Sequence, residues 1–349
     1  MSQNSNGYPA ARGHDIIVIG TSAGGIEALS TLVAGLPVDL PAALFVVLHT
    51  PTHSLRVLAK ILMRHGRLPA KEAEDGELIR HGQIYIAPPD YHLLLKPDTV
   101  RVMQGPRENL WRPAIDPLFR SAAVAHGAHT VGVILSGMMD DGVAGLLAVH
   151  RCSGKVIVQT PDDAAFADLP TNALAAVNAD YTLPVADMGA VLDRLVRQPA
   201  PLSPPPPQDL LLESTIIERV MNGATHENEV GELVAYSCPG CGGPLKEIKA
   251  GGHRHYRCSV GHSYTEQALV TDQTHTIEQA LWSALRLLEE RANMLMNLAR
   301  DAQVRGRPAS VTTFEQRAQE SRTNAGLIRG LLQQGLAEGR IASPPGPLS

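Results

Sequence analysis

A serine stands in a glycine-rich turn near the start of the sequence, within Gly20-Thr21-Ser22-Ala23-Gly24-Gly25. An apolar run, residues 16–19, precedes the turn and residues 26–34 follow with helical spacing, which predicts strand, tight turn and helix. Gly20-x-Ser22-x-Gly24 fits the pattern G-x-S-x-G, in which a serine hydroxyl stands above a sheet edge at a helix N-terminus. Such a serine can act as a nucleophile, and the N–H groups at the helix end can stabilise an oxyanion.

Other interpretations compete for the same turn. The glycine spacing is also close to that of short-chain dehydrogenases, but a dinucleotide site of that type requires an acidic residue at the end of the second strand, where this sequence has His49. It also requires a Tyr-x-x-x-Lys pair, which this sequence lacks. In the α/β-hydrolase fold the serine turn follows several strands, whereas this turn follows the first predicted strand. A different sheet fold with the same turn chemistry remains open, and so does a Ser22 that only caps its helix.

Two further strand ends carry the residue types that a serine nucleophile needs. His49 closes the apolar run 43–48, and Asp140 and Asp141 come just after the apolar run 131–135. The carboxyl ends of parallel strands share one rim of a sheet, where ligands bind. A single histidine, or an aspartate before glycine, is more often structural. A serine, a histidine and an aspartate on one rim match a nucleophile, a base and an orienting acid.

The chain from residue 15 to residue 198 alternates apolar strand patterns with helical patterns. The predicted strands are residues 16–19, 43–48, 84–87, 131–135 and 156–159. The predicted helices are residues 26–34, 54–65, 116–125, 143–152, 171–177 and 188–197. This alternation is typical of an α/β fold with a doubly wound, mostly parallel sheet covered by helices. Residues 93–96 and 100–103 predict an antiparallel hairpin, so we expect a mixed sheet.

The composition excludes several classes of protein. Of the 349 residues, 44% are hydrophobic and 19% are charged, so the chain is long enough for two or more globular domains. The formal net charge of -5 provides no basic surface for nucleic acid. The sequence contains no apolar run of about 18 residues, so no membrane span is predicted. The N-terminal residues lack the apolar core of a secretory signal. Four cysteines do not indicate a disulfide scaffold, and we expect a cytoplasmic protein.

A proline-rich stretch, residues 199–207, predicts an extended linker into a second part of the chain. Residues 208–275 contain Cys238-x2-Cys241 and Cys258-x3-His262. Two close pairs of soft ligands at this separation suit a tetrahedral zinc ion in a small zinc ribbon. Four protein ligands leave no open position, so such a zinc would be structural. A metal-free remnant or a redox pair of cysteines is the alternative.

Helical patterns follow the Cys/His segment. Residues 276–303 predict one helix, and a second helix is expected from about residue 311 to residue 336. We expect the two to pack as a helical hairpin over residues 276–337, with docking to a receptor or to a second copy as the rival interpretation. The segments 1–14 and 338–349 are expected to be disordered. The apolar stripe of the first helix comprises Ile277, Leu281, Ala284, Leu288, Leu295 and Leu298.

Five separated segments within residues 15–197 together resemble one known family. The segments are Ile19-Gly20-Thr21-Ser22-Ala23-Gly24-Gly25, Val47-Leu48-His49-Thr50-Pro51, Ile86-Ala87-Pro88-Pro89-Asp90-Tyr91-His92, Arg112-Pro113-Ala114-Ile115-Asp116-Pro117-Leu118-Phe119 and Leu135-Ser136-Gly137-Met138-Met139-Asp140-Asp141-Gly142. In this order they resemble the catalytic domain of the chemotaxis protein-glutamate methylesterase family, CheB. The Cys/His segment and the helix after it are similar to C-terminal extensions of stand-alone members without a receiver domain.

The resemblance implies a serine hydrolase that removes methyl esters from glutamate side chains of chemoreceptors during chemotactic adaptation. Many members of the family also deamidate receptor glutamines. By position, the resemblance implies Ser22 as nucleophile, His49 as general base and Asp141 as orienting acid. It also implies an oxyanion hole formed by the backbone N–H groups of Ala23 and Met138. No cofactor is implied for catalysis, and the implied partner is a methyl-accepting chemoreceptor or a similar methylated sensor.

Two departures from the family pattern affect these expectations. Only about 14 residues precede the first strand, too few for a receiver domain, so we do not expect activation by phosphorylation of this chain. Control is expected from a partner such as a response regulator or a kinase, or from another chain, or is absent. The family's Ala-Pro-Gly-Asp block has Pro89 in place of its glycine. The alternative function is a signalling adaptor with a vestigial hydrolase domain that acts through its C-terminal region.

Overall fold

The computed structural model describes residues 13–337 except residues 53, 55, 224–230 and 251–252. Its central feature is a seven-stranded sheet in the order β3-β4-β2-β1-β7-β8-β9, and every neighbouring pair is parallel. The strands are β1 (Ile16–Thr21), β2 (Ala43–Leu48), β3 (Ala70–Glu72), β4 (Ile84–Ile86), β7 (Thr130–Ile134), β8 (Lys155–Gln159) and β9 (Tyr181–Leu183). The expected α/β class with a doubly wound parallel sheet is confirmed.

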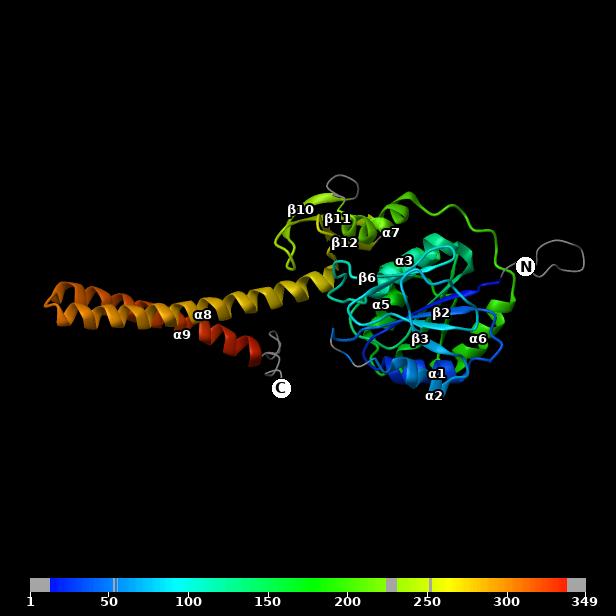
Figure 1. Cartoon of the computed structure of the whole chain (residues 1–349), viewed down its shortest axis with the longest axis horizontal. Helices are drawn as coiled ribbons and strands as arrows, with labels where there is room; N and C mark the ends of the chain where they lie inside the picture. The colour runs from blue at the N-terminus through cyan, green and yellow to red at the C-terminus, as the bar shows by residue number, and fades with distance from the viewer. Residues whose placement is uncertain (1–12, 53, 55, 224–230, 251–252, 338–349) are drawn as a thin grey trace, which may run out of the picture. The chain divides into compact units, whose positions relative to one another are not determined.

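Helices cover both faces of this sheet, as Figure 1 shows for α1 and α2 on one side and α3 on the other. The first face carries α1 (Gly25–Ala34), α2 (Leu58–His65) and α6 (Val185–Arg197). The second face carries α3 (Ile115–His126), α4 (Val143–Arg151) and α5 (Asp168–Ala176). Two short 3-10 helices are η1 (Gly127–His129) and η2 (Pro161–Asp163). The result is a three-layer domain with two hydrophobic cores, one on each side of the sheet.

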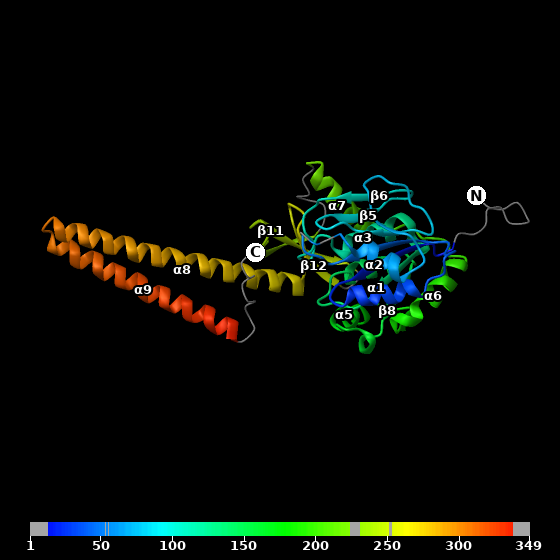
Figure 2. The ribbon, with the colours of Figure 1, turned by 60° about the horizontal axis from the view of Figure 1, so that its bottom comes forward.

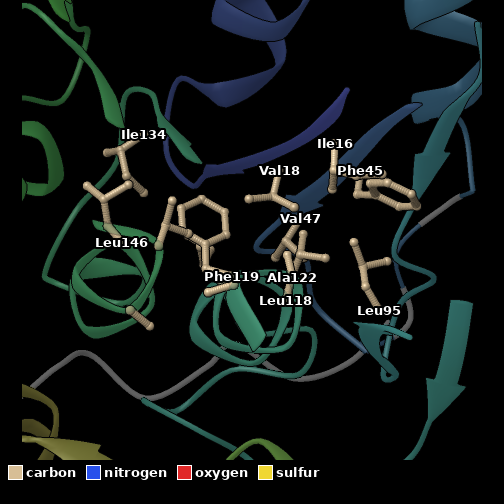
Figure 3. Close-up of a cluster of buried hydrophobic side chains, with 14 of the residues drawn as sticks. Ile16, Val18, Phe45, Val47, Leu95, Leu118, Phe119, Ala122, Ile134 and Leu146 are labelled. Carbon is tan, nitrogen blue, oxygen red and sulfur yellow. The ribbon is translucent and has the colours of Figure 1, made fainter. Parts of the chain in front are cut away.

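The alternation of side chains along each strand produces these two cores. In β1, Ile16 and Val18 belong to the core under α3 and α4, whereas Ile17 and Ile19 belong to the core under α1 and α6. Figure 3 shows Val18 of β1 near Phe119 of α3. Strands that are buried on both faces appear in the sequence as continuous apolar runs, which is why the inner strands could be predicted.

The predicted antiparallel hairpin is present, but among the described strands it does not join the central sheet. Strands β5 (His92–Leu95) and β6 (Val100–Met103) form a separate two-stranded sheet. The expectation of a mixed sheet is wrong because the hairpin packs on α3. Leu93 and Leu95 enter the core there, and the Leu95 N–H donates to the Ser121 hydroxyl at 3.0 Å. The short strands β3 and β9 occupy the edges of the central sheet instead.

The direction of strand addition reverses at β1. The chain passes from β1 to β2 on one side, whereas β7 pairs with the other side of β1 and leads outward to β8. Such a reversal opens a crevice at the carboxyl ends of the strands, and ligands of open α/β sheets bind there. The turns that follow β1, β2 and β7 therefore lie at one rim.

Residues 232–265, which we call the Cys/His region, belong to the same compact unit as the central sheet. This unit extends to Leu269. Residues 201–207 have no regular secondary structure, and the Ser203 hydroxyl accepts a hydrogen bond from the Ala128 N–H at 2.9 Å. Helix α7 (Gln208–Met221), which the sequence analysis did not identify, packs on α3. A four-stranded antiparallel sheet follows, made of β10 (Glu232–Ser237), β11 (Pro244–Ala250), β12 (His253–Cys258) and β13 (Ser263–Thr265).

Two long helices, α8 (Glu266–Val304) and α9 (Pro308–Ala337), complete the described chain. From Val270 onward they form a separate compact unit, in which they run side by side as a helical hairpin (Figure 2). Leu285 of α8 is buried with Ala325 and Leu332 of α9. Helix α8 begins ahead of the expected residue 276. Of the expected stripe, Leu281 and Leu288 pack on the Leu285 cluster and Leu295 is buried. Ile277 and Leu298 are exposed.

The ends of the chain were expected to be disordered. Within the first segment, Gly13 pairs with Pro199, and His14 Nδ1 lies 2.7 Å from the carbonyl oxygen of Ala128. Residues 1–12 and 338–349 lie outside the described residues. Among the described helices, none combines the length and the apolar character that crossing a lipid bilayer requires.

Candidate active site

Ser22 lies at the end of β1, in the turn that leads into α1. Gly24 adopts the left-handed conformation with φ 72°, and a Cβ at this position would lie 2.7 Å from the Ser136 hydroxyl. The Ser22 N–H and the Thr21 hydroxyl both donate to the Ser136 carbonyl oxygen, at 3.0 and 2.7 Å. These bonds join the turn after β1 to the turn after β7 and fix the backbone of Ser22 at the rim.

His49 follows β2 and contacts two of the other predicted site residues through its two ring nitrogens. Nδ1 lies 3.1 Å from Ser22 Oγ, and Nε2 lies 2.7 Å from Asp141 Oδ2. The His49 side chain is 2% exposed, and its ring stacks on the indole of Trp111 with centroids 4.5 Å apart and planes 9° apart. Stacking and burial hold the imidazole in the plane that connects the serine to the aspartate.

The two contacts define the tautomer of His49. The Asp141 carboxylate can only accept, so Nε2 carries the proton and donates to it. Nδ1 then has the free lone pair, which accepts the Ser22 hydroxyl proton. In the serine-protease template the two nitrogens have the opposite assignment, with Nε2 toward the serine. Either nitrogen of a neutral imidazole can act as the base, so the reversed ring is equally able to activate the hydroxyl.

Asp141 is buried among donors. Its Oδ2 accepts the Ile115 N–H at 2.6 Å, and its Oδ1 accepts the Asn109 side-chain amide at 2.8 Å. Ile115 is the first residue of α3, so the carboxylate lies at the positive end of a helix dipole. The neighbouring Asp140 instead accepts the Thr265 hydroxyl at 2.8 Å. Asp141 is therefore the aspartate in the hydrogen-bond chain through the imidazole.

Backbone N–H groups beside the serine differ in whether they are already used. The N–H of Gly137 donates to the carbonyl oxygen of Phe166 at 3.0 Å. By contrast, the N–H groups of Ala23 and Met138 donate to no acceptor among the described residues. Two N–H groups on the turns after β1 and β7 are thus available to a substrate oxygen. Their role as an oxyanion hole stays a prediction.

Comparisons with known proteins agree with this arrangement. Residues 17–192 match the family model described as CheB methylesterase. A relative from Leptospira interrogans is 37% identical over 183 residues, which cover 52% of this chain and 95% of the relative. The chain belongs to the CheB methylesterase family. The structure of the CheB methylesterase catalytic domain from Thermotoga maritima matches with a TM-score of 0.51 and 35% identity, over 52% of this chain and 98% of that chain.

Another CheB-family relative carries an activity in its name. This protein, from Anaeromyxobacter dehalogenans, is named protein-glutamate methylesterase/protein-glutamine glutaminase 3. It is 41% identical over 182 residues, which cover 52% of each chain. The Cys/His region and helices α8 and α9 lie outside the residues that the CheB model matches.

Three residues of this CheB-type site were missed by the sequence analysis: Asn109, Trp111 and Asp116. The Asn109 amide nitrogen donates to both Asp116 Oδ2 and Asp141 Oδ1, at 2.8 Å each. Burial raises the pKa of Asp116 well above its usual range, and the nearby charge of Asp141 raises it further. The one available signal was position, since these residues lie within or just before the segment 112–119 that carried the resemblance to CheB.

Cys238, Cys241, Cys258 and His262 converge on the four-stranded sheet. Their potential ligand atoms all lie within 4.8 Å of one another. Cys258 Sγ is 3.6 Å from Cys241 Sγ and 3.6 Å from His262 Nδ1. A tetrahedral zinc ion, with bonds of about 2.3 Å to sulfur and about 2.0 Å to nitrogen, requires ligand separations of about 3.5–3.8 Å. The separations of 3.6–3.7 Å that join His262 to Cys238 and Cys258, and Cys258 to Cys241, match these values, and the wider ones must shorten when an ion binds. The four residues fit a zinc ion with that adjustment.

Thiol ionisation in this cluster also suits a metal. The hydrogen bond with Cys258 lowers the pKa of Cys238 to about 3, and the same contact raises the pKa of Cys258. A thiolate is the form of cysteine that binds a metal. The fourth cysteine, Cys152, is buried apart from the cluster at the end of α4, where burial raises the pKa of its thiol.

Proposed function

We propose that this chain is a protein-glutamate methylesterase, which hydrolyses methyl esters of glutamate side chains in a chemoreceptor and deamidates receptor glutamines at the same site. One observation carries the proposal: an unbroken hydrogen-bond chain runs from Ser22 Oγ through His49 to Asp141 on the rim of a CheB-family sheet. An adaptor with a vestigial hydrolase domain would not need this buried chain. The geometry therefore supports an enzyme.

In the first step, Ser22 Oγ attacks the carbonyl carbon of the ester while His49 Nδ1 takes the hydroxyl proton. The imidazolium that forms keeps its Nε2–H on Asp141, which stabilises the positive charge. The tetrahedral intermediate collapses as methanol leaves with the proton from Nδ1. With a glutamine side chain, ammonia leaves in the same way.

In the second step, water attacks the acyl-enzyme and His49 takes its proton. The C–O bond to Ser22 then breaks, and the proton returns to Oγ, which releases the glutamate carboxyl group. In both steps the substrate oxygen becomes negative beside the available N–H groups of Ala23 and Met138. Removing one donor of this kind typically costs about 2.7–4 kcal/mol of transition-state stabilisation.

Methanol release from a methylated chemoreceptor fragment tests this proposal. We expect Ser22→Ala to lower the rate by several orders of magnitude, because no nucleophile remains. Ser30→Ala is the matched control, since the Ser30 hydroxyl bonds only within α1, to the Ile26 carbonyl oxygen. Equal methanol release by the Ser22→Ala variant and the native chain would refute the proposal. Ammonia release from a receptor glutamine tests deamidation with the same pair.

We further propose that Cys238, Cys241, Cys258 and His262 bind a structural zinc ion. The ligand separations support this, and the four ligands would occupy every position of a tetrahedral ion. Zinc therefore takes no part in ester hydrolysis. One zinc per chain in the purified protein is the expected measurement.

We also propose a cytoplasmic location and control by a response regulator or kinase partner. The four free cysteines support a reducing compartment. Affinity purification of the full chain from its own cells, followed by identification of bound proteins, tests the partner. Recovery of neither a response regulator nor a kinase would contradict it.

A further inference from the structure

The Cys/His region makes main-chain contact with the loop that carries Asn109. The Asn109 N–H donates to the carbonyl oxygen of Ser263 at 2.8 Å, and the Ser263 N–H donates to that of Arg107 at 3.3 Å. Glu108 and Ser263 form a parallel bridge. Strand β13 of the Cys/His region therefore hydrogen-bonds to the loop of residues 107–109, which belongs to the candidate active site.

A third contact fixes the orientation of the Asn109 side chain. The Thr265 N–H donates to Asn109 Oδ1 at 2.9 Å. A main-chain N–H can be met only by the oxygen end of the amide, so the nitrogen end must face the opposite way. That end donates to Asp116 and Asp141. A flipped amide would direct its oxygen at two carboxyl groups and leave the Thr265 N–H unpaired, which is costly in a buried position.

Buried ion pairs join the same two regions. Glu108 is 1% exposed and lies 3.0 Å from both Arg120 of α3 and Arg257 of β12. Burial alone would raise the pKa of Glu108, but the charges of Arg120 and Arg257 hold it well below its usual range. Removing one partner of such a pair leaves a buried charge without compensation. The Cys/His region is therefore an integral part of this unit.

The cysteine cluster holds the turn that leads into β13. Cys258 ends β12 and His262 immediately precedes β13, and the Cys258 N–H donates to the His262 carbonyl oxygen at 3.0 Å. Tyr264, the middle residue of β13, has its hydroxyl 3.6 Å from Cys238 Sγ. A metal bound by the cluster would tie both ends of this turn to Cys238 and Cys241.

We propose that the Cys/His region, residues 232–265, is a metal-held support of the active site, in which β13 orients the Asn109 amide and thereby positions the Asp141 carboxylate. Asn109 is a positioning residue, because it contacts the orienting acid and acts on the reaction only through it. The inference rests on the proposed esterase function for its kinetic test, so its other tests use no ester substrate.

The first test removes the metal from the full chain. Cys241→Ser is expected to lower the zinc content and to lower kcat for methanol release about tenfold to a hundredfold, with KM changed less than about twofold. The split is expected because Asp141 acts on the chemical step, whereas substrate binding does not use it. Cys152→Ser is the matched control, with full zinc content and native kcat. Native kcat in Cys241→Ser chains that have lost their zinc would overturn the inference.

The second test changes Asn109, the residue that contacts Asp141. Asn109→Ala is expected to retain zinc and to lower kcat by a similar factor. The double variant Cys241→Ser/Asn109→Ala should be no slower than the slower single variant, because both changes act through one amide. Multiplied losses in the double variant would overturn the inference.

A substrate-free readout separates this inference from the proposed function. With a fluorophosphonate, the Ser22 Oγ–P bond forms as the P–F bond breaks; fluoride leaves and His49 takes the serine proton. The labelling rate should fall in Cys241→Ser and Asn109→Ala by the factor seen in kcat, and the NMR signal of the His49 Nε2–H should shift. Labelling without methanol release in the native chain would refute the esterase proposal alone. Unchanged labelling and an unchanged NMR signal in both variants would overturn the inference alone.

Discussion

The rim of the central sheet and the Cys/His region are ordered by different means. Ser22, His49 and Asp141 follow strands whose inner residues are fully buried, so core packing and main-chain hydrogen bonds set their positions. The Cys/His region has only a small buried cluster, and domains below about 40 residues usually need disulfides, metals or a partner to hold together. That cluster comprises Cys238, Leu245, Tyr256, Cys258 and Tyr264, together with Ala268 and Leu269 from the start of α8.

The comparison shows that order at the rim comes from the hydrophobic core beneath it. Order in the Cys/His region must come from cross-links, whether metal ligands or buried ion pairs. The same kind of substitution should therefore have different consequences in the two regions.

The largest effect is expected at the rim. Asp141→Asn should lower kcat for methanol release by about 10⁴, because an amide in place of the carboxylate favours the wrong tautomer of His49. The exposed Asp162 provides the matched control, and Asp162→Asn should retain native kcat. A loss of less than tenfold in Asp141→Asn would mean that the rim geometry does not carry the chemistry.

The core beneath the rim comes second. Phe119 is fully buried between the sheet and α4, and Phe119→Ala should lower the opening free energy of β1 amides by about 3–5 kcal/mol. Leu245→Ala in the Cys/His region should leave β1 unaffected and increase exchange only in β10–β13. Hydrogen exchange read by mass spectrometry measures both. Equal losses of protection in β1 would remove the distinction between the two regions.

The pH dependence of stability tests a link between α7 and β12. Burial would raise the pKa of Glu213, but the charge of His255, 3.0 Å away, lowers it from 4.5 to about 2. Because the folded pKa lies below the unfolded one, this carboxylate stabilises the protein above about pH 4.5, and the stabilisation is lost as the pH falls toward about 2. The shift corresponds to about 3 kcal/mol.

Urea unfolding between about pH 5 and about pH 2 measures this effect. Glu213→Gln should flatten the decline in unfolding free energy with falling pH. The exposed Glu27 of α1 is the control, and Glu27→Gln should leave the decline unchanged. An identical decline in Glu213→Gln and the native chain would argue against a folded-state role for this ion pair.

The smallest effect is expected on the outer surface of the Cys/His region. Arg254 of β12 pairs with Glu266 at 2.9 Å, but both side chains are 54% exposed, so Arg254→Gln should cost less than about 1 kcal/mol. Three residues along the same strand, Arg257 is 5% exposed, and Arg257→Gln should cost clearly more than Arg254→Gln, because it removes one of the two buried arginines that compensate the charge of Glu108. Similar costs for the two arginines, measured by urea unfolding, would contradict a cross-linked interface.

Several elements could be predicted because their signal is local. The inner strands appear as apolar runs, so the turns that end them, with Ser22, His49 and Asp141, could be located before the fold was known. Strands β3 and β9 have three residues each, too few for a periodic pattern. The hairpin was predicted but not its place, because Leu93 and Leu95 would be apolar either at a sheet edge or on α3.

The loop that carries Asn109 had no recognisable signal. Asn109 and Leu110 both have positive φ, at 49° and 75°, and neither is a glycine that would have indicated such a turn. Trp111 stacks on an imidazole that is 62 positions earlier in the chain (111 − 49). Contacts of this kind depend on the path of the chain in space and leave no periodic pattern.

The amino-acid sequence by itself was enough to predict the α/β class, the family that the chain resembles, and the residue types at each strand end. The periodicity of buried residues and the positions of strand ends depend on short stretches of sequence, so they can be predicted without the fold. Only the folded structure decided which ring nitrogen of His49 faces which partner, and that β13 contacts Asn109 from more than 150 residues away (263 − 109 = 154). Those outcomes depend on which surfaces contact each other in the folded chain, because buried donors are stable only when they are hydrogen-bonded to an acceptor.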